Sequence, residues 1–284
     1  MRMAVLGLVL LAVPAAAEVR SGSFLSQALR REVRYVADLP PSYATSDSRY
    51  PVVYALHGLF EDASFWERRG LAADLAAERS AGRVRDFIVV AVDGGNSFFV
   101  NHAGGAYQDL VTRDLIAHVD ATFRTIPQRD ARGLLGVSMG GYAALRIALS
   151  DPGRFAAVAT HSAMLLTRPP TAVEGAGRGQ MQAFARVFGD PIDAALWAAN
   201  DPLALAEKAD PQALPALRFD CGREDRYGLF AGQRELERRL TARGAKLEAE
   251  LPPGDHGYDY VHTVLPKSLR FLSEHLSPRL ATRR

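Results

Sequence analysis

A serine between two glycines is the first feature of this sequence that could do chemistry. The stretch Gly136–Gly140 reads G-V-S-M-G and fits the pattern G-x-S-x-G, in which a strand turns sharply into a helix and leaves the serine hydroxyl exposed. An apolar run precedes the stretch and a helical run of small residues follows it. Glycines suit such a turn, because a Cβ would clash where strand and helix approach closely. The alternative is a serine that caps an ordinary helix, and these five residues alone do not decide.

A serine hydroxyl is a weak nucleophile at neutral pH, so the hypothesis requires a base and an acid that orients the base. In folds with this turn the three residues follow the order serine, acid, histidine. His256 fits that order best, because it lies in a loop between the last predicted strand and the last predicted helix. Asp225 is the favoured acid, and Asp220 and Glu224 of the same segment remain alternatives. The predicted catalytic residues are therefore Ser138, Asp225 and His256.

Acyl transfer through a serine also needs hydrogen-bond donors for the oxyanion that forms during attack. One donor is the amide after the nucleophile, here that of Met139, and the second comes from a loop after an earlier strand. The segment Leu56–Phe60 ends an apolar run and is similar to that loop. The amide of Leu59 is therefore the predicted second donor, and we expect His57 to brace the loop as a structural histidine.

The first seventeen residues have the pattern of a secretory signal peptide. Arg2 supplies a positive charge, residues 4–13 are apolar, and Ala15–Ala17 resembles a cleavage site. The apolar run is shorter than the roughly 20 residues of a membrane-spanning helix. We predict cleavage after Ala17, which leaves 284 − 17 = 267 residues, and a secreted or periplasmic protein without a stable membrane span. A first strand or an uncleaved anchor is the alternative.

Charge and cysteine content exclude several classes of function. The net charge is +2, from 34 basic and 32 acidic residues, and no stretch before the tail at 281–284 is strongly basic, so nucleic acid is not an expected partner. Cys221 is the single cysteine, which excludes an intramolecular disulfide and a cysteine-rich zinc site; we expect it to be buried and inert. No metal or cofactor is expected, since no cluster of His, Asp and Glu has ligand spacing.

Apolar, β-branched runs alternate with longer helical patterns along the chain. Several of these runs are apolar throughout, which suits strands covered on both faces of a parallel sheet. The alternation predicts the α/β class, with an open, mostly parallel sheet and helices on both faces. A hairpin between 33–39 and residues near 24–28 is expected at the edge of the sheet. The predicted strands are 33–39, 52–56, 87–92, 133–137, 156–160, 217–220 and 247–251, and the predicted helices are 63–78, 107–123, 142–149, 229–243 and 258–275.

One stretch, from about residue 164 to 210, breaks the alternation. Glycine and proline cluster at 168–179, and short helical patterns follow at 181–188, 192–199 and 202–209. The stretch is too long for a plain connection between two strands. We interpret it as an insertion of short helices over the edge where strands end, either a lid or pocket wall or inert packing. The predicted organisation is a single domain over 18–284 that contains this insertion.

As a set, these motifs resemble the esterase family of α/β-hydrolase fold that includes S-formylglutathione hydrolases (esterase D), feruloyl and acetylxylan esterases, and the mycolyltransferases. The similarity runs from about Arg34 to Leu272, and the set is more specific than any one of its parts. The residues that carry it are Leu56–Leu59 with Trp66, Asp93–Asn101, Gly136–Gly141, Asp220–Asp225, Gly254–His256, Phe188–Pro191 and Asn200–Leu203.

The resemblance implies an α/β-hydrolase fold in which Ser138, Asp225 and His256 form the triad and the amides of Leu59 and Met139 form the oxyanion hole. It also implies that the loop 93–101 borders the acyl or leaving-group site. Phe60 and Phe98 are the candidate substrate-binding residues. The pair Phe98–Phe99 either lines an apolar pocket or packs in the interior.

The resulting prediction is an exported serine carboxylesterase that forms an acyl-enzyme and acts on short-acyl or carbohydrate-linked esters. Export disfavours an S-formylglutathione hydrolase-type thioesterase. An acyltransferase that replaces water by a sugar or lipid hydroxyl is a further alternative, since it would use the same triad. A non-catalytic binding module is disfavoured by the intact set of three residues. A polysaccharide substrate rests on the resemblance alone, and the acyl chain length and oligomeric state are not predicted.

Overall fold

The computed structural model describes residues 17–171 and 175–278. The predicted signal peptide lies outside the described residues apart from Ala17, and so does the basic tail at 281–284. Among the described residues, no helix is both long enough and apolar enough to cross a bilayer.

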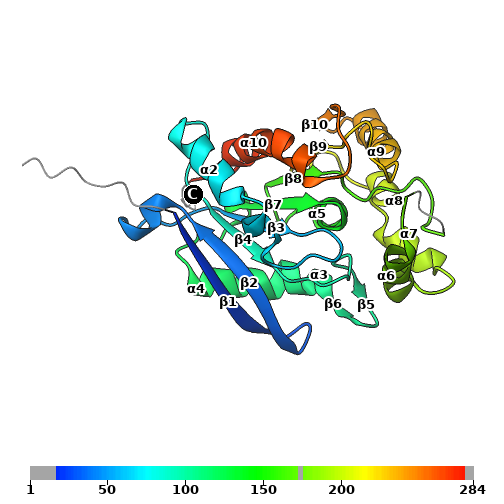
Figure 1. The fold of residues 1–284 in the computed structure, drawn as a ribbon, viewed down its shortest axis with the longest axis horizontal. Helices are drawn as coiled ribbons and strands as arrows, with labels where there is room; N and C mark the ends of the chain where they lie inside the picture. Colours follow the sequence, from blue (N-terminus) through cyan, green and yellow to red (C-terminus); the bar gives the residue numbers. More distant parts are fainter. Residues whose placement is uncertain (1–16, 172–174, 279–284) are drawn as a thin grey trace, which may run out of the picture.

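An eight-stranded sheet runs through the middle of the molecule in the order β1-β2-β4-β3-β7-β8-β9-β10 (Figure 1). The strands from β4 to β10 in this order pair parallel, and β1 and β2 pair antiparallel at one edge. Strands β3, β4 and β8 are buried along their whole length, as their uninterrupted apolar sequences predict. The strands are β1 (Glu18–Ser26), β2 (Arg31–Leu39), β3 (Val52–Leu56), β4 (Ile88–Val92), β7 (Arg132–Val137), β8 (Ala157–His161), β9 (Ala216–Asp220) and β10 (Leu247–Glu250).

Helices cover both faces of the sheet (Figure 1). Because successive side chains of a strand point to opposite faces, Val53 and Ala55 of β3 pack with α2 and α10, whereas Tyr54 packs in the core shared with α4, α5 and α9. The helices outside the insertion are α1 (Phe65–Arg68), α2 (Leu71–Ser80), α3 (Tyr107–Asp109), α4 (Ile116–Thr122), α5 (Met139–Ser150), α9 (Phe230–Ala242) and α10 (Tyr258–His275).

The predicted fold class is confirmed, and most predicted elements lie within two residues of their observed bounds. The predicted helix 63–78 is wrong in one respect: it is two helices, separated at Gly70, whose φ of 83° is left-handed and ends α1. The predicted helix 107–123 contains a π-helical turn at Leu110–Leu115. Helix α5 begins at Met139, three residues earlier than predicted, directly after the candidate nucleophile.

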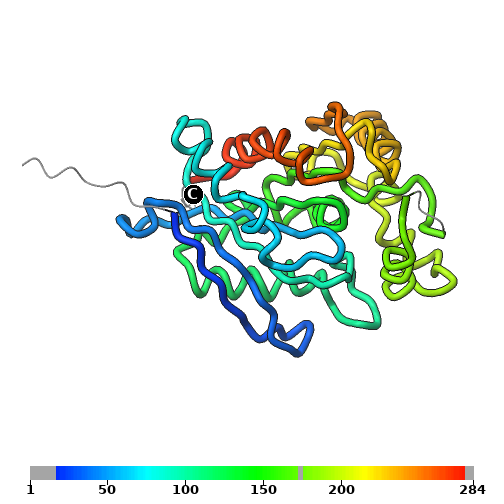
Figure 2. The backbone as a smooth tube through the Cα atoms, viewed as in Figure 1, coloured from blue at the N-terminus to red at the C-terminus, as the bar shows by residue number. Residues whose placement is uncertain are grey.

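The insertion contains three short helices, α6 (Arg178–Phe188), α7 (Ala194–Asn200) and α8 (Pro202–Ala206), and no strand in its described part. The backbone trace places it at one end of the molecule, far from the β1–β2 hairpin (Figure 2). Helix α8 packs against α5 and α9. A small two-stranded sheet, β5 (Asn101–His102) with β6 (Gly105–Ala106), lies in the loop after β4. The insertion therefore sits beside the helix that follows the candidate nucleophile.

Candidate active site

Ser138 occupies a strained turn between β7 and α5. Its φ of 53° and ψ of −114° are rarely adopted by residues other than glycine, and such backbone strain costs about 1–3 kcal/mol. The flanking glycines make the turn possible. A Cβ on Gly136 would overlap the Gly140 carbonyl, and a Cβ on Gly140 would overlap the carbonyl of Leu56 in β3. This close packing places the Ser138 hydroxyl just beyond the carboxyl end of β7.

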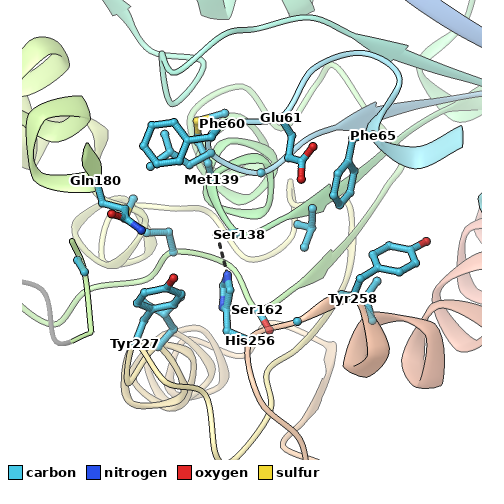
Figure 3. Close-up of a pocket in the computed structure, with 18 of the residues that line it drawn as sticks. Phe60, Glu61, Phe65, Ser138, Met139, Ser162, Gln180, Tyr227, His256 and Tyr258 are labelled. Atoms are coloured by element: carbon cyan, nitrogen blue, oxygen red, sulfur yellow. Dashed lines mark hydrogen bonds between the residues drawn. The ribbon is translucent and has the colours of Figure 1, made fainter. Parts of the chain in front are cut away.

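Ser138, His256 and Asp225 lie in one line of hydrogen-bonding contacts. Nε2 of His256 is 3.1 Å from Oγ of Ser138 (Figure 3), and its Nδ1 is 2.8 Å from Oδ2 of Asp225. If Nδ1 carries the proton and donates it to the carboxylate, Nε2 is left as the acceptor for the serine hydroxyl. This is the arrangement in which a histidine removes the proton of an attacking serine.

The topology of the sheet brings these three side chains together. Strands β7, β8, β9 and β10 are neighbours and run parallel, so their carboxyl ends meet at the same edge. Ser138 follows β7 directly, Asp225 lies in the turn after β9, and His256 lies in the loop between β10 and α10. The edge where parallel strands end is the usual ligand-binding edge of open α/β sheets.

The carboxylate of Asp225 is fully buried, and both of its oxygens accept hydrogen bonds. Besides the imidazole of His256, it accepts the backbone N–H of Tyr227 at 2.9 Å and the thiol of Cys221 at 3.4 Å. These donors fix the direction in which the carboxylate faces. A fixed carboxylate in turn holds the imidazole in one orientation.

The two alternative acids have other partners. Asp220 is buried, lies 2.9 Å from Nδ1 of His161, and accepts the hydroxyl of Tyr260 at 2.6 Å. Glu224 accepts the backbone N–H of Gly254 at 2.5 Å. Of the three candidate acids, Asp225 is therefore the one that contacts His256 among the described residues.

The predicted oxyanion donors flank the serine. Gly58, next to Leu59, lies so close that a Cβ on it would be 3.7 Å from Cβ of Ser138. The Leu59 amide has no hydrogen-bond partner in the described part of the chain. Met139 is the first residue of α5, where amides have no carbonyl partner within the helix and the helix dipole is positive. The loop geometry therefore leaves donors free beside the serine hydroxyl.

Two contacts brace the loop that carries Leu59. His57 is completely buried; its Nδ1 lies 2.7 Å from the Gly58 carbonyl, and its Nε2 accepts the Gly94 amide at 3.0 Å. Burial lowers the pKa of His57, which keeps the ring neutral at neutral pH. The side chain of Asn96 accepts the amide of Phe60 at 2.8 Å. The histidine is thus a brace for the loop, as the sequence predicted.

A pocket of about 280 Å³ opens around Ser138 and His256. Figure 3 shows two sides: Phe60, Gln180 and Tyr227 lie on one, and Glu61, Phe65 and Tyr258 lie on the other. Its full lining is Gly58, Leu59, Phe60, Glu61, Phe65, Arg69, Phe98, Val137, Ser138, Met139, Ser162, Met164, Ala176, Gln180, Phe184, Tyr227, Leu229, His256, Gly257, Tyr258 and Val261.

The pair Phe98–Phe99 fulfils both of the roles that the sequence left open. Phe98 lines the pocket, and its ring stacks on that of Phe184 at a centroid distance of 4.8 Å. Phe99 packs inside, against Gly94 and the ring of His57. Phe60, the other candidate, also lines the pocket with 56% of its surface exposed, and it reaches Gly179 of the insertion helix α6.

Sequence reasoning missed most of the pocket wall. Gln180 and Phe184 come from α6, Phe65 and Tyr258 are the first residues of α1 and α10, and Arg69 directly follows α1. The spacing of Gln180 and Phe184 places them on one face of a helix, which is the one signal that could have paired them. Among the described residues, no group of three His, Cys, Asp or Glu side chains could hold a metal ion.

Comparison with known sequences places the chain among esterases. The family model described as "Putative esterase" matches residues 26–272. The esterase Rv1288 of Mycobacterium tuberculosis is 29% identical over 245 residues, which are 77% of this chain and 51% of that protein. The acetyl esterase of Caldicellulosiruptor saccharolyticus is 23% identical over 269 residues, 89% of this chain and 97% of that one. The chain thus spans about half the length of the first of these relatives.

Comparison with solved structures shows the same fold. A ferulic acid esterase superposes with a TM-score of 0.78 at 22% identity, covering 93% of this chain and all of that one. An S-formylglutathione hydrolase from Agrobacterium tumefaciens superposes with a TM-score of 0.75 at 22% identity, covering 92% of this chain and 96% of that one. At this identity the likeness concerns the α/β-hydrolase architecture.

Proposed function

Because the chain belongs to the family described as "Putative esterase", we propose that it is an exported serine carboxylesterase that hydrolyses short-acyl or carbohydrate-linked esters. The observation that carries the proposal is the line of contacts from Ser138 through His256 to Asp225, with distances of 3.1 Å and 2.8 Å. The names of the acetyl esterase relative and of the ferulic acid esterase of like fold support this choice of substrates.

The reaction proceeds in two steps. His256 takes the proton of the Ser138 hydroxyl as the oxygen attacks the ester carbonyl, and the amides of Leu59 and Met139 stabilise the oxyanion. The C–O bond to the alcohol breaks, the acyl group stays on the serine, and the alcohol leaves with the proton held by His256. Water then attacks the acyl-serine with His256 as base, which releases the acid and restores the hydroxyl. Asp225 stabilises the imidazolium in both steps.

The pocket favours small and medium-sized groups. Its volume of about 280 Å³ is near the lower end of the range for small-molecule sites. The rings of Phe60, Phe98 and Phe184 give one side of it an apolar surface. We therefore expect short acyl chains and single aromatic acids to be better substrates than long fatty acyl esters.

Turnover of an ester series tests the proposal. p-Nitrophenyl esters from acetate to long chains, together with methyl ferulate, are assayed with wild-type protein and with Ser138→Ala. We expect turnover that decreases towards long chains, no turnover by Ser138→Ala, and covalent labelling of Ser138 by a fluorophosphonate. Full activity of Ser138→Ala, or wild-type protein that neither turns over p-nitrophenyl acetate nor is labelled, would refute the proposal.

Water as the acyl acceptor is tested separately from ester cleavage. Sugars are added at increasing concentration to the p-nitrophenyl acetate assay, and the acetylated sugar and free acetate are both quantified. We expect free acetate to remain the main product. Acylated sugar that forms faster than free acid would replace the hydrolase by an acyltransferase with the same acyl-enzyme.

Export is proposed from the N-terminal pattern. Strand β1 begins at Glu18, so cleavage after Ala17 would leave it whole. We expect the protein recovered from the periplasm or the medium to begin at Glu18 by N-terminal sequencing. Recovery of the uncleaved chain in the cytoplasm would contradict a secreted or periplasmic location.

A further inference from the structure

Arg146 is a buried arginine on the helix that begins beside the candidate nucleophile. It lies in α5, two turns after Ser138, and its exposed fraction is 2%. Within the described residues no carboxylate forms an ion pair with it, whereas the equally buried Arg218 pairs with Glu248 and Glu250. A buried guanidinium bound to neutral groups is costly unless its hydrogen bonds are satisfied. The partners of Arg146 therefore indicate what this cation does.

The guanidinium joins three segments that are separate in the sequence. Its Nη2 donates to the backbone carbonyl of Phe99 at 2.6 Å. Its Nη1 donates to the side-chain oxygens of Gln108, at 2.5 Å, and Asn200, at 3.2 Å. These partners lie in the loop 93–101, in α3 and at the end of the insertion helix α7. The planar fork of an arginine suits it to hold several acceptors in one fixed geometry.

The carbonyl that Arg146 binds ends an unusual turn. Phe98 and Phe99 are consecutive residues with φ of 52° and 51°, a left-handed conformation that two large residues in succession rarely adopt. The amide of Phe99 is held from the other side by the Ser97 hydroxyl at 3.0 Å. The hydrogen bond from Arg146 is thus one of the contacts that fix the direction of the Phe98 side chain.

Phe98 in turn forms part of the pocket wall. Its ring stacks on Phe184 of α6 and meets the edge of Tyr142 of α5 at 6.1 Å, with the planes nearly perpendicular. Arg146 itself is absent from the pocket lining, so any effect on the substrate is indirect, and Phe98 is the lining residue next to its partner Phe99. A change of a few tenths of an ångström in the turn would move the ring that bounds the pocket.

We propose that Arg146 is a positioning residue that sets which groups the pocket accepts, by holding the Phe98–Phe99 turn against the nucleophile helix and the end of α7. The proposal rests on the ester hydrolysis proposed above. It concerns selectivity between substrates, whereas the bonds made and broken at Ser138 are the same for all of them.

The test compares Arg146→Met, Arg146→Lys and the control Arg218→Met. Ratios of kcat/KM are measured for p-nitrophenyl acetate against octanoate, and for acetate esters of phenol against naphthol. We expect one of the two ratios to change about tenfold or more in Arg146→Met, the size of effect that a reshaped apolar pocket produces. Lysine keeps the charge without the fork and should give an intermediate change. Arg218→Met should lower the melting temperature and leave both ratios unchanged.

The same experiment separates this proposal from the proposed function. Labelling of Ser138 by a small fluorophosphonate should persist in every variant, because the triad and the oxyanion loop are untouched. If wild-type protein is not labelled, the proposed esterase function is refuted. Unchanged ratios in Arg146→Met, with labelling intact and a lower melting temperature, would make Arg146 a purely structural residue and overturn the proposal.

A combined variant shows whether the effect passes through Phe98. If it does, Phe98→Ala alone and Phe98→Ala with Arg146→Met should have the same substrate ratios. If the ratio in the double variant instead differs from the wild-type ratio by the product of the two single effects, this route is contradicted. Should Arg146→Met fail to fold, Gln108→Leu is the substitute variant, because it removes one acceptor of Arg146 and leaves the arginine in place. We then expect at least one substrate ratio to differ from that of the wild type. Wild-type ratios in Gln108→Leu would count against the proposal.

Discussion

Asp220 and His161 form a completely buried pair, with 2.9 Å between the carboxylate and Nδ1. The pair lies at the ends of neighbouring strands, next to the proposed triad, since the backbone N–H of Ser138 donates to the carbonyl of His161. Its contacts resemble those of the acid and the histidine of a catalytic triad. However, Nε2 of His161 has no hydrogen-bond partner in the described residues, so no serine hydroxyl completes the set. The pair anchors Tyr260 of α10 through a further hydrogen bond of 2.6 Å, and so stabilises the helix that follows the His256 loop.

Asp225→Asn is expected to lower activity, whereas Asp220→Asn is expected to lower stability. Asp225→Asn should lower kcat by about 10⁴-fold, because an amide orients the histidine with the wrong tautomer, and should change the melting temperature little. Asp220→Asn should keep kcat near the wild-type value and lower the free energy of unfolding by about 1–3 kcal/mol, since an NH2 group replaces one of the two buried oxygens that accept hydrogen bonds from His161 and Tyr260. Kinetics on p-nitrophenyl acetate and thermal unfolding measure both. A larger loss of kcat in Asp220→Asn than in Asp225→Asn would contradict the assignment of Asp225 as the acid that orients His256.

Gly140→Ala is expected to impair catalysis. The added methyl would overlap the Leu56 carbonyl and separate the nucleophile turn from the strand that carries the oxyanion loop. Loss of one oxyanion donor lowers kcat by about 10²–10³-fold, and we expect an effect of that size. Gly153→Ala is the matched control, because its new Cβ meets no atom within 4 Å; it should leave kcat unchanged and stabilise the fold by up to about 1 kcal/mol. Equal activity of the two variants would contradict this account.

Glu78 makes the stability depend on pH in the acid range. Its side chain is 5% exposed and lies 2.8 Å from Arg83 and 2.6 Å from Arg270. The hydrogen bonds from these arginines hold the pKa of Glu78 well below its usual value. Because the folded-state pKa is depressed, the stabilisation is complete above the unfolded-state pKa of about 4.3 and is lost as the pH falls below it.

The corresponding experiment compares wild-type protein with Glu78→Gln. The difference in melting temperature between them should be largest near pH 7 and should shrink as the pH falls from about 5 to 3. Thermal unfolding followed by circular dichroism measures it. A difference that stays constant over this range would mean that the charge of Glu78 does not contribute.

Cys221 should resist alkylation in the folded protein. Its side chain is completely buried, and burial together with the nearby Asp225 raises the pKa of the thiol. Since the thiolate is the reactive form, iodoacetamide at pH 8 should modify the native protein far more slowly than the urea-unfolded protein. Mass spectrometry of the intact chain gives both rates, and Cys221→Ala provides the unreacted control. Rapid modification of the native protein would show that the thiol is accessible.

The sequence allowed the sheet to be predicted well because its strands are apolar on both faces. Runs such as 52–56 and 87–92 leave little choice other than a covered parallel strand, and the order of motifs then favoured His256 as the base. The choice between Asp225 and Asp220 was harder. Both follow the same strand, and which one reaches His256 depends on the backbone path of the turn that contains Gly222, which packs against the Gly254 carbonyl.

The pocket wall could not be predicted in the same way. Gln180 and Phe184 reach the pocket because α6 is carried there by the packing of the insertion against α5 and α9. Local patterns contain no information on that placement. The break at Gly70 was missed for a similar reason: the apolar pattern continues across it, and the left-handed glycine becomes visible only in the backbone.

The positions of the proposed catalytic residues along the chain have a consequence for biosynthesis. Ser138 and His256 are 118 residues apart, and β10, which leads into the histidine loop, takes the last place in the sheet. A growing polypeptide therefore contains the serine long before it contains the base. If Ser138 and His256 act as proposed, the hydroxyl has the reactivity of any other serine until α10 has left the ribosome and docked. We then expect ester cleavage to begin only once the whole sheet has formed.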